Sequence, residues 1–94
     1  MKVVVVWKRE TEYGREMEDW IRGFGSVFGR EVESISPETR EGDEFAKLYG
    51  IVDYPSILAL DDSGKLLEMW RGLPLPTLNE VSYYADFQKS KTVL

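Results

Sequence analysis

Two short stretches of the chain combine residue types and spacing that are capable of chemistry. The first is Thr11, Glu12 and Tyr13, which we expect at the start of a helix, where free N–H groups hold anions or polarise a nucleophile. A threonine hydroxyl attacks only with a base beside it, and here only Glu10 and Glu12 flank it. The interpretation we favour is that Thr11 caps the helix and the glutamates stabilise its first turn.

The second stretch is Asp53, Tyr54 and Pro55, which leads into an apolar run at residues 56–60. Without further information, Pro55 simply begins a strand, a position at which the missing N–H of proline removes no hydrogen bond of the sheet. The bond before it would then be trans, as most bonds before proline are.

The 94-residue chain contains no cysteine and no histidine. It therefore has no thiolate nucleophile, no disulfide and no cysteine metal site, and it lacks the commonest general base and metal ligand. The acidic residues at 41–44 and 61–62 lack the six or so ligands at loop spacing that Ca²⁺ requires. We expect no catalytic residue, no metal site and no cofactor. Disulfide exchange is excluded, and whether the chain is an enzyme of another kind stays open.

The charge balance limits the kinds of partner. The chain has 12 Lys+Arg against 17 Asp+Glu, a net charge of −5, which disfavours both nucleic acid and anionic membranes. The apolar run at residues 3–7 is too short to span a bilayer, and the charged residues that follow argue against a secretory signal. We therefore expect a cytoplasmic protein that binds neither nucleic acid nor membrane.

Aromatic residues are further candidates for binding. Trp20 lies on an apolar helical stripe, which predicts a core residue. Trp7 ends the first expected strand and is equally compatible with an exposed interface and with partial burial. Tyr83 lies off the inward face of the last expected helix, so we expect it to be exposed.

The elements that must position these residues alternate along one domain of residues 1–94, with a polar tail from about residue 88. Thr77 and Glu80 form a capping box at the start of the last helix. Because the first two strands are joined through a helix, we expect them to be parallel, and the last two to form a hairpin. This predicts an α/β fold, a mixed four-stranded sheet with helices on both faces. The expected strands are 3–7, 31–36, 56–60 and 65–71, and the expected helices begin near 13, 43 and 78.

The stretch from Leu48 to Leu60 resembles the segment that leads into the cis-proline strand of the thioredoxin superfamily. Residues 61–64 resemble the hairpin turn that follows it, and residues 71–74 with Leu78 resemble the approach to the last helix. The resemblance covers essentially the whole chain and implies a thioredoxin-like fold. It also implies that the bond before Pro55 is cis, and that the backbone of Asp53 and Tyr54 lies beside the loop at Thr11. In relatives that edge pairs with an extended peptide.

The chain departs from the family at the residues that carry electrons. Thr11 and Gly14 stand where the two cysteines belong, and only Tyr13 matches the motif between them. Val5 occupies the position of a buried aspartate in thioredoxins, and the Gly-Gly pair that binds glutathione in glutaredoxins is absent. The resemblance therefore implies a redox-inactive thioredoxin-like domain.

The leading functional expectation is a binding or assembly module. It would hold a protein or peptide partner on the surface around Trp7, residues 11–13, Asp53, Tyr54 and Pro55, or it would self-associate into a homo-oligomer. One alternative is a glutathione-transferase-like enzyme with a hydroxyl in place of the thiol. Pro55 with Leu67 and Glu68 resembles that family's arrangement, although Met69 stands where its serine belongs. The other alternative is a purely structural subunit.

Overall fold

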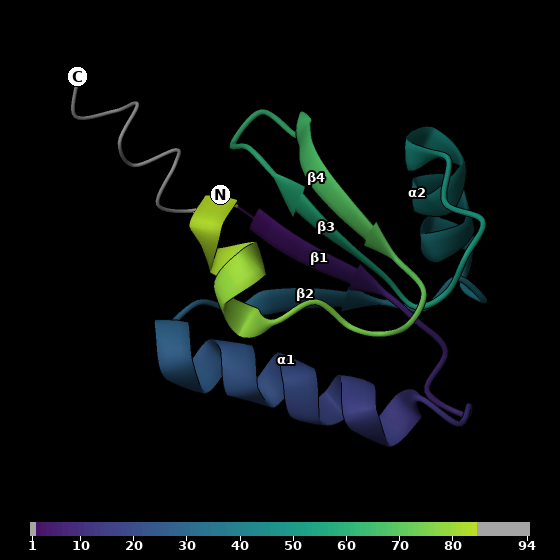
Figure 1. Cartoon of the computed structure of the whole chain (residues 1–94). Coiled ribbons are helices and arrows are strands. Elements are labelled where there is room, and N and C mark those ends of the chain that lie inside the picture. The colour runs from purple at the N-terminus through teal and green to yellow at the C-terminus, as the bar shows by residue number, and fades with distance from the viewer. Residues whose placement is uncertain (1, 85–94) are drawn as a thin grey trace.

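A computed structural model describes residues 2–84 (Figure 1). The predicted order of elements is confirmed over this range. The polar tail expected from residue 88, and the continuation of the last helix to Ala85, lie outside the described residues. The elements are β1 (Lys2–Val6), α1 (Gly14–Phe28), β2 (Val32–Ile35), α2 (Arg40–Tyr49), β3 (Ser56–Leu60) and β4 (Leu66–Arg71), followed by a helical segment at 78–84.

The four strands form one mixed sheet in the order β2-β1-β3-β4. β1 runs parallel to β2, with Val5 opposite Ser34, and antiparallel to β3, with Val5 opposite Ile57. β3 and β4 form the predicted antiparallel hairpin. Because β1 lies inside the sheet with both faces covered, its run of valines is buried on alternate sides, as continuous β-branched runs commonly are.

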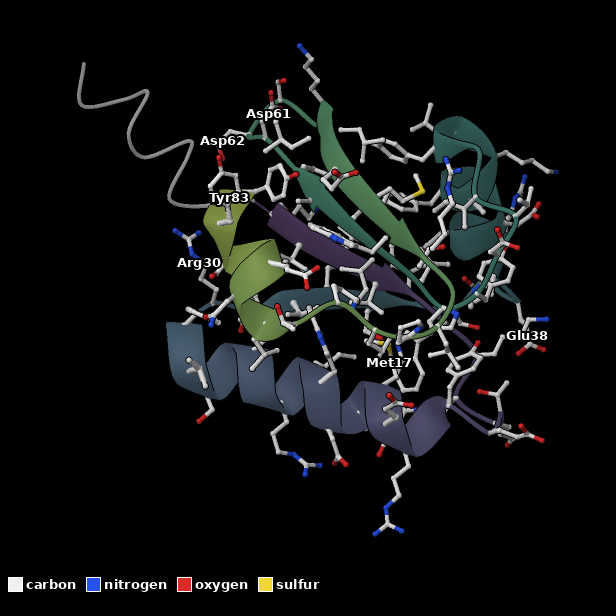
Figure 2. All side chains as sticks on the ribbon, in the orientation of Figure 1. Met17, Arg30, Glu38, Asp61, Asp62 and Tyr83 are labelled. Atoms are coloured by element: carbon white, nitrogen blue, oxygen red, sulfur yellow. The ribbon has the colours of Figure 1, made fainter. Side chains whose placement is uncertain are left out.

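Helices cover both faces of the sheet, as predicted. α1 and the 78–84 segment pack on one face, where Val3, Val5 and Ile57 meet Met17 and Val81. α2 packs on the other face, where Val4, Val6 and Leu58 meet Ala46. Figure 1 shows α1 and α2 on opposite sides of the strands, and Figure 2 shows Met17 pointing from α1 toward the sheet.

The packing of α1 keeps it helical through its glycines. The sequence predicts that the helix frays or stops between Gly23 and Gly29, and it does end within that stretch. It continues through Gly23 and Gly25 to Phe28 and is capped by Gly29, whose φ is 62°. Each interior glycine costs a helix up to about 1 kcal/mol. Burial of Trp20 and Phe24, whose rings stack with centroids 5.3 Å apart, outweighs that cost, because each large apolar side chain contributes roughly 1.5–3 kcal/mol. Trp20 is thus a core residue, as predicted.

The start of α2 lies earlier than the sequence predicts. The helix begins at Arg40 instead of residue 43, because the Thr39 hydroxyl accepts a hydrogen bond from the Gly42 N–H at 3.0 Å and so caps it. Thr77 caps the 78–84 segment in the same way by accepting from the Glu80 N–H at 3.1 Å, as the capping box predicts.

Candidate functional site

The loop between β1 and α1 is held by its own side chains. The Tyr13 hydroxyl accepts a hydrogen bond from the Lys8 N–H at 3.0 Å, and the Thr11 hydroxyl donates to the Lys8 carbonyl at 2.8 Å. The Gly14 N–H donates in turn to the Thr11 carbonyl at 3.1 Å. A Cβ at Gly14 would lie 2.2 Å from the Arg9 carbonyl oxygen, so only glycine allows the loop to close this tightly.

The expectation that Thr11 caps α1 is wrong. The helix begins at Gly14, its N-cap is Tyr13, and no side chain caps it. A turn at residues 11–14 separates Thr11 from the helix, and its hydroxyl donates to the Lys8 carbonyl instead of accepting from the first turn. Within residues 2–84 that hydroxyl has a carbonyl as its partner and no carboxylate base, so the geometry there offers no means of activating it. Glu12 is exposed beside it.

The segment at Tyr54 presents unpaired backbone groups. The Tyr54–Pro55 bond is cis, Tyr54 is half-buried and Pro55 is buried. The carbonyl of the exposed Asp53 accepts from the Ser56 hydroxyl at 2.6 Å, and the Pro55 carbonyl accepts from the Gly72 N–H at 2.8 Å. Among residues 2–84, the N–H and C=O of Tyr54 have no hydrogen-bond partner. The chain thus leaves one donor and one acceptor, both from Tyr54, available at this point.

Lys8 joins the two stretches that the sequence singled out. Its backbone N–H bonds to the Tyr13 hydroxyl, and its Nζ lies 5.8 Å from the centroid of the Tyr54 ring, within reach of a cation–π contact. Tyr13 and Tyr54, which are distant in sequence, therefore contact the same residue. We refer to Lys8, Tyr13 and Tyr54 as the proline-loop surface. Pro55, which the sequence expectation also placed there, is less than 2% exposed, so its side chain offers a partner no surface.

Trp7 does not belong to this surface. The structure buries it to 4% exposure, against the expectation that its ring faces a partner. Trp7 follows Val5 by two residues, so its side chain takes the α1 side of the sheet and joins the core there. Its indole N–H donates to the Ser34 hydroxyl, and the Arg9 guanidinium lies 5.2 Å from the ring centroid. Both contacts hold the ring inside the fold.

Two apolar residues beside the proline-loop surface were not among the predicted site residues. Leu73 is 55% exposed and follows Gly72, which bonds to Pro55. Val52 is 78% exposed and precedes Tyr54 by two residues. Both lie in segments without hydrophobic periodicity, so no pattern in the sequence separates them from buried residues. Lys8 was missed for a similar reason, since charge alone does not reveal what a lysine covers.

Tyr83 is exposed as predicted, but it lies elsewhere. Figure 2 shows Tyr83, Asp61 and Asp62 at one end of the molecule and Glu38 at the other. Pro55 lies just before the start of β3, and the turn at residues 61–64 follows the end of that strand. Tyr83 therefore contributes nothing to the proline-loop surface.

Two acidic residues of the β3–β4 hairpin, Asp61 and Glu68, have structural partners. Asp61 accepts from the Ser63 hydroxyl, the Ser63 N–H and the Lys65 N–H, and these hydrogen bonds, led by that of the Ser63 hydroxyl, lower the pKa of its carboxyl. Glu68 accepts from the Met69 N–H on one oxygen and from the Tyr84 hydroxyl on the other. Within residues 2–84, no three acidic side chains converge as the ligands of a metal ion would. No helix in the same range is both long and apolar enough to cross a bilayer.

The comparisons with known proteins bear on the fold alone. No protein-family model matches the chain, and no curated protein sequence matches it. Among solved structures, it is similar to thioredoxin 1 from the thermophilic eubacterium Thermosipho africanus, with a TM-score of 0.72 and 14% sequence identity. The match covers 95% of this chain and 99% of that one. The chain therefore has a thioredoxin-like fold, and it has no cysteine with which to perform disulfide chemistry.

Proposed function

We propose that the chain is a binding module that holds an extended segment of a partner protein across the proline-loop surface. The observation that supports this most directly is the unpaired N–H and C=O of Tyr54 among residues 2–84. An extended peptide that runs past Tyr54 would satisfy both groups, because strand addition provides one donor and one acceptor at each paired residue.

The side chains around Tyr54 suit such a segment. Val52 and Leu73 expose apolar surface beside the unpaired backbone, and Lys8 and Asp53 place one charge of each sign close by. Backbone pairing would provide affinity, and the apolar residues would select alternate side chains of the segment. With no cysteine in the chain, the segment is held without a covalent bond. In this proposal the protein acts in the cytoplasm and requires no cofactor.

The experiment begins with selection of peptides from a random display library on the folded domain. The selected peptides are then titrated into isotopically labelled protein. We expect saturable shifts of the Tyr54 amide and its neighbours. The variant Leu73→Asp should weaken binding about tenfold or more, because it places a charge in an apolar contact.

Leu48→Asp is the matched control, since Leu48 is 75% exposed on α2 and lies outside the proline-loop surface. It should leave the affinity unchanged. Selected peptides that bind both variants as tightly as the natural chain would contradict the proposal.

Self-association and the two alternatives have their own measurements. Sedimentation would detect a homo-oligomer or a structural subunit that assembles with itself. Calorimetry with glutathione would detect a transferase-like site. Within residues 2–84 no contact favours a transferase-like site. Glu68 is the residue on which that alternative depends, and both of its carboxylate oxygens already accept hydrogen bonds, from the Met69 N–H and the Tyr84 hydroxyl.

A further inference from the structure

β2 lies at the edge of the sheet with half of its backbone groups facing outward. The Ile35 carbonyl accepts from the Trp7 N–H at 3.1 Å, so Ile35 faces β1, and by alternation Glu33 does too. Val32 and Ser34 therefore direct their N–H and C=O groups away from the sheet. Within residues 2–84 these groups have no partner, which makes this edge a template for a further strand.

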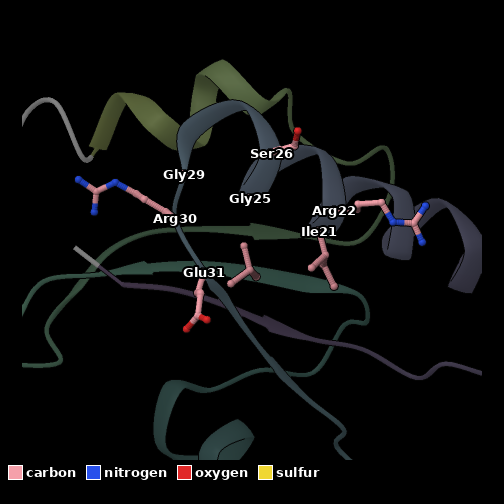
Figure 3. Close-up of a pocket in the computed structure, with 8 residues that line it drawn as sticks. Ile21, Arg22, Gly25, Ser26, Gly29, Arg30 and Glu31 are labelled. Atoms are coloured by element: carbon pink, nitrogen blue, oxygen red, sulfur yellow. The ribbon is translucent and has the colours of Figure 1, made fainter.

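A hollow runs along this edge beneath α1. One part, of about 640 Å³, is lined by Ile21, Arg22, Gly25 and Val32, among others. A second part, of about 340 Å³, shares Ile21 and Arg22 with the first and extends to Ser34. Figure 3 shows Gly25 and Gly29 at the end of α1 above the strand. These glycines lack side chains that would fill the space, so the helix leaves the apolar floor open.

Arginines lie at both ends of the larger part of the hollow (Figure 3). In that part Arg22 and Arg30 are accompanied by Glu31 alone, while the whole chain has a net charge of −5. Toward Ser34, Arg9 is balanced by Glu18, and the adjoining hollow at Ser36 is also lined by Glu10 and Glu38. Arg9 is paired with Glu18 at 2.8 Å, and Arg22 lies 3.7 Å from Asp19, with both of the latter side chains largely exposed. Arg30 has no ion-pair partner within residues 2–84, and Figure 3 shows it and Arg22 at opposite ends of the hollow. An occupant with acidic residues at two points would complement them.

A second copy of this chain is a poor occupant of the edge. If Val32 pairs antiparallel with Val32 of the second copy, Glu31 of one copy lies opposite Glu33 of the other. If Val32 pairs instead with Ser34 of the second copy, the two Glu33 residues lie opposite each other. Like charges directly opposite one another destabilise a sheet, an effect that Lys2, paired with Glu33 at 2.6 Å, offsets in part. If Ser34 pairs with Ser34 of the second copy, Val32 lies opposite Ser36. The Ser36 carbonyl already accepts hydrogen bonds from the N–H and hydroxyl of Thr39, so it is not available for pairing.

We propose that the edge of β2 binds a second extended segment of a partner protein, in which acidic residues flank apolar ones on a single face. The segment would pair with the backbone of Val32 and Ser34. Its apolar side chains would fill the hollow above Ile21, and its carboxylates would reach Arg22 and Arg30. This site is separate from the proline-loop surface, and the experiments that test one proposal do not decide the other.

The test uses the capped peptide Ser-Asp-Thr-Val-Thr-Val-Thr-Asp-Ser, whose alternation puts both aspartates and both valines on one face. We expect it to shift the amides of Val32 and Ser34 saturably in labelled protein. A version with lysine in place of each aspartate should not do so. The double variant Arg22→Glu, Arg30→Glu should weaken binding about tenfold or more.

The backbone contact is tested with Ser34→Pro, which removes an outward N–H and leaves the pairing of Glu33 and Ile35 with β1 in place. It should abolish binding. Ser34→Ala is its matched control, since it also loses the Trp7 hydrogen bond but keeps the N–H. Should the proline variant fail to fold, Gly25→Leu tests the same site by filling the hollow, because a Cβ there meets its nearest neighbour, the Arg30 carbonyl oxygen, at an ordinary 3.5 Å.

Three results would overturn the proposal. The first is the absence of saturable shifts at Val32 and Ser34 at millimolar peptide. The second is a set of shifts confined to residues 52–56 and 72–73, which would place the peptide on the proline-loop surface. The third is a dimer in sedimentation that Ser34→Pro dissociates, which would assign the edge to a second copy of the chain.

Discussion

The hydroxyl of Tyr13 accepts a hydrogen bond from the backbone N–H of Lys8 at 3.0 Å. This contact closes the loop that follows β1 and places the Lys8 side chain over the ring of Tyr54. The Tyr13 phenol oxygen therefore acts with the Thr11 hydroxyl, which donates to the Lys8 carbonyl, in holding this part of the proline-loop surface.

We expect Tyr13→Phe to lower the free energy of unfolding by about 0.5–1.5 kcal/mol, because it leaves the Lys8 N–H without its acceptor. Chemical denaturation measures the change. Tyr54→Phe is the control, since within residues 2–84 the Tyr54 hydroxyl has no hydrogen-bond partner and the ring is retained. Equal stability of the two variants would contradict this account of the loop.

Trp7 should behave as a core residue. Trp7→Ala is expected to lower stability by about 3–5 kcal/mol, through lost burial and the cavity left behind. Denaturant midpoints on Trp7→Ala and on Trp7→Phe, which fills most of the space, provide the measurement. If Trp7→Ala were as stable as the natural chain and lost only peptide binding, Trp7 would be a binding residue and the prediction would be wrong.

Two glycines of α1 should respond in opposite directions to alanine. At Gly14 a Cβ would lie 2.2 Å from the Arg9 carbonyl oxygen, so Gly14→Ala should shift the backbone and lower the melting temperature. At Gly23 the nearest contact is the Leu78 side chain at 3.6 Å. Gly23→Ala should therefore raise stability by about 0.5–1 kcal/mol through helix propensity alone. Thermal melts of both variants check the pair, and a stabilised Gly14→Ala would refute the close approach.

The turn after β3 should make stability depend on pH in the acid range. Hydrogen bonds from Ser63 and Lys65 lower the pKa of the Asp61 carboxyl below its usual 3.8. Since the folded state favours the charged form, this contribution is present above pH 3.8 and is lost as pH falls through the lowered pKa. Ser63→Ala removes the leading hydrogen bond, so the pKa of Asp61 should move back toward 3.8. A carbon-detected titration of the carboxyl group measures it, and an unchanged pKa would show that the backbone donors suffice.

The sequence alone determined the order of elements, because that order depends on local patterns. The helical spacing of apolar residues predicts the two long helices, and the continuous β-branched run predicts β1. Glycine is the residue that most readily ends a helix in the left-handed conformation, so Gly50 predicts the end of α2, and its φ is indeed 67°. The absence of cysteine excluded disulfide chemistry on composition alone. The segments at residues 11–13 and 53–55 were also chosen from the sequence, with the help of the family resemblance.

Only the tertiary structure decided which of those residues are accessible and what they contact. The burial of Trp7 depends on α1 and on Ser34, which is 27 residues away. The contact of Lys8 with Tyr54 and the exposure of Leu73 likewise depend on how separate loops meet. The free edge of β2 follows from strand order, and the hollow beside it follows from the glycines of α1 meeting that edge. Contacts between distant segments leave no periodic trace in a single sequence, because each residue type is compatible with several surroundings.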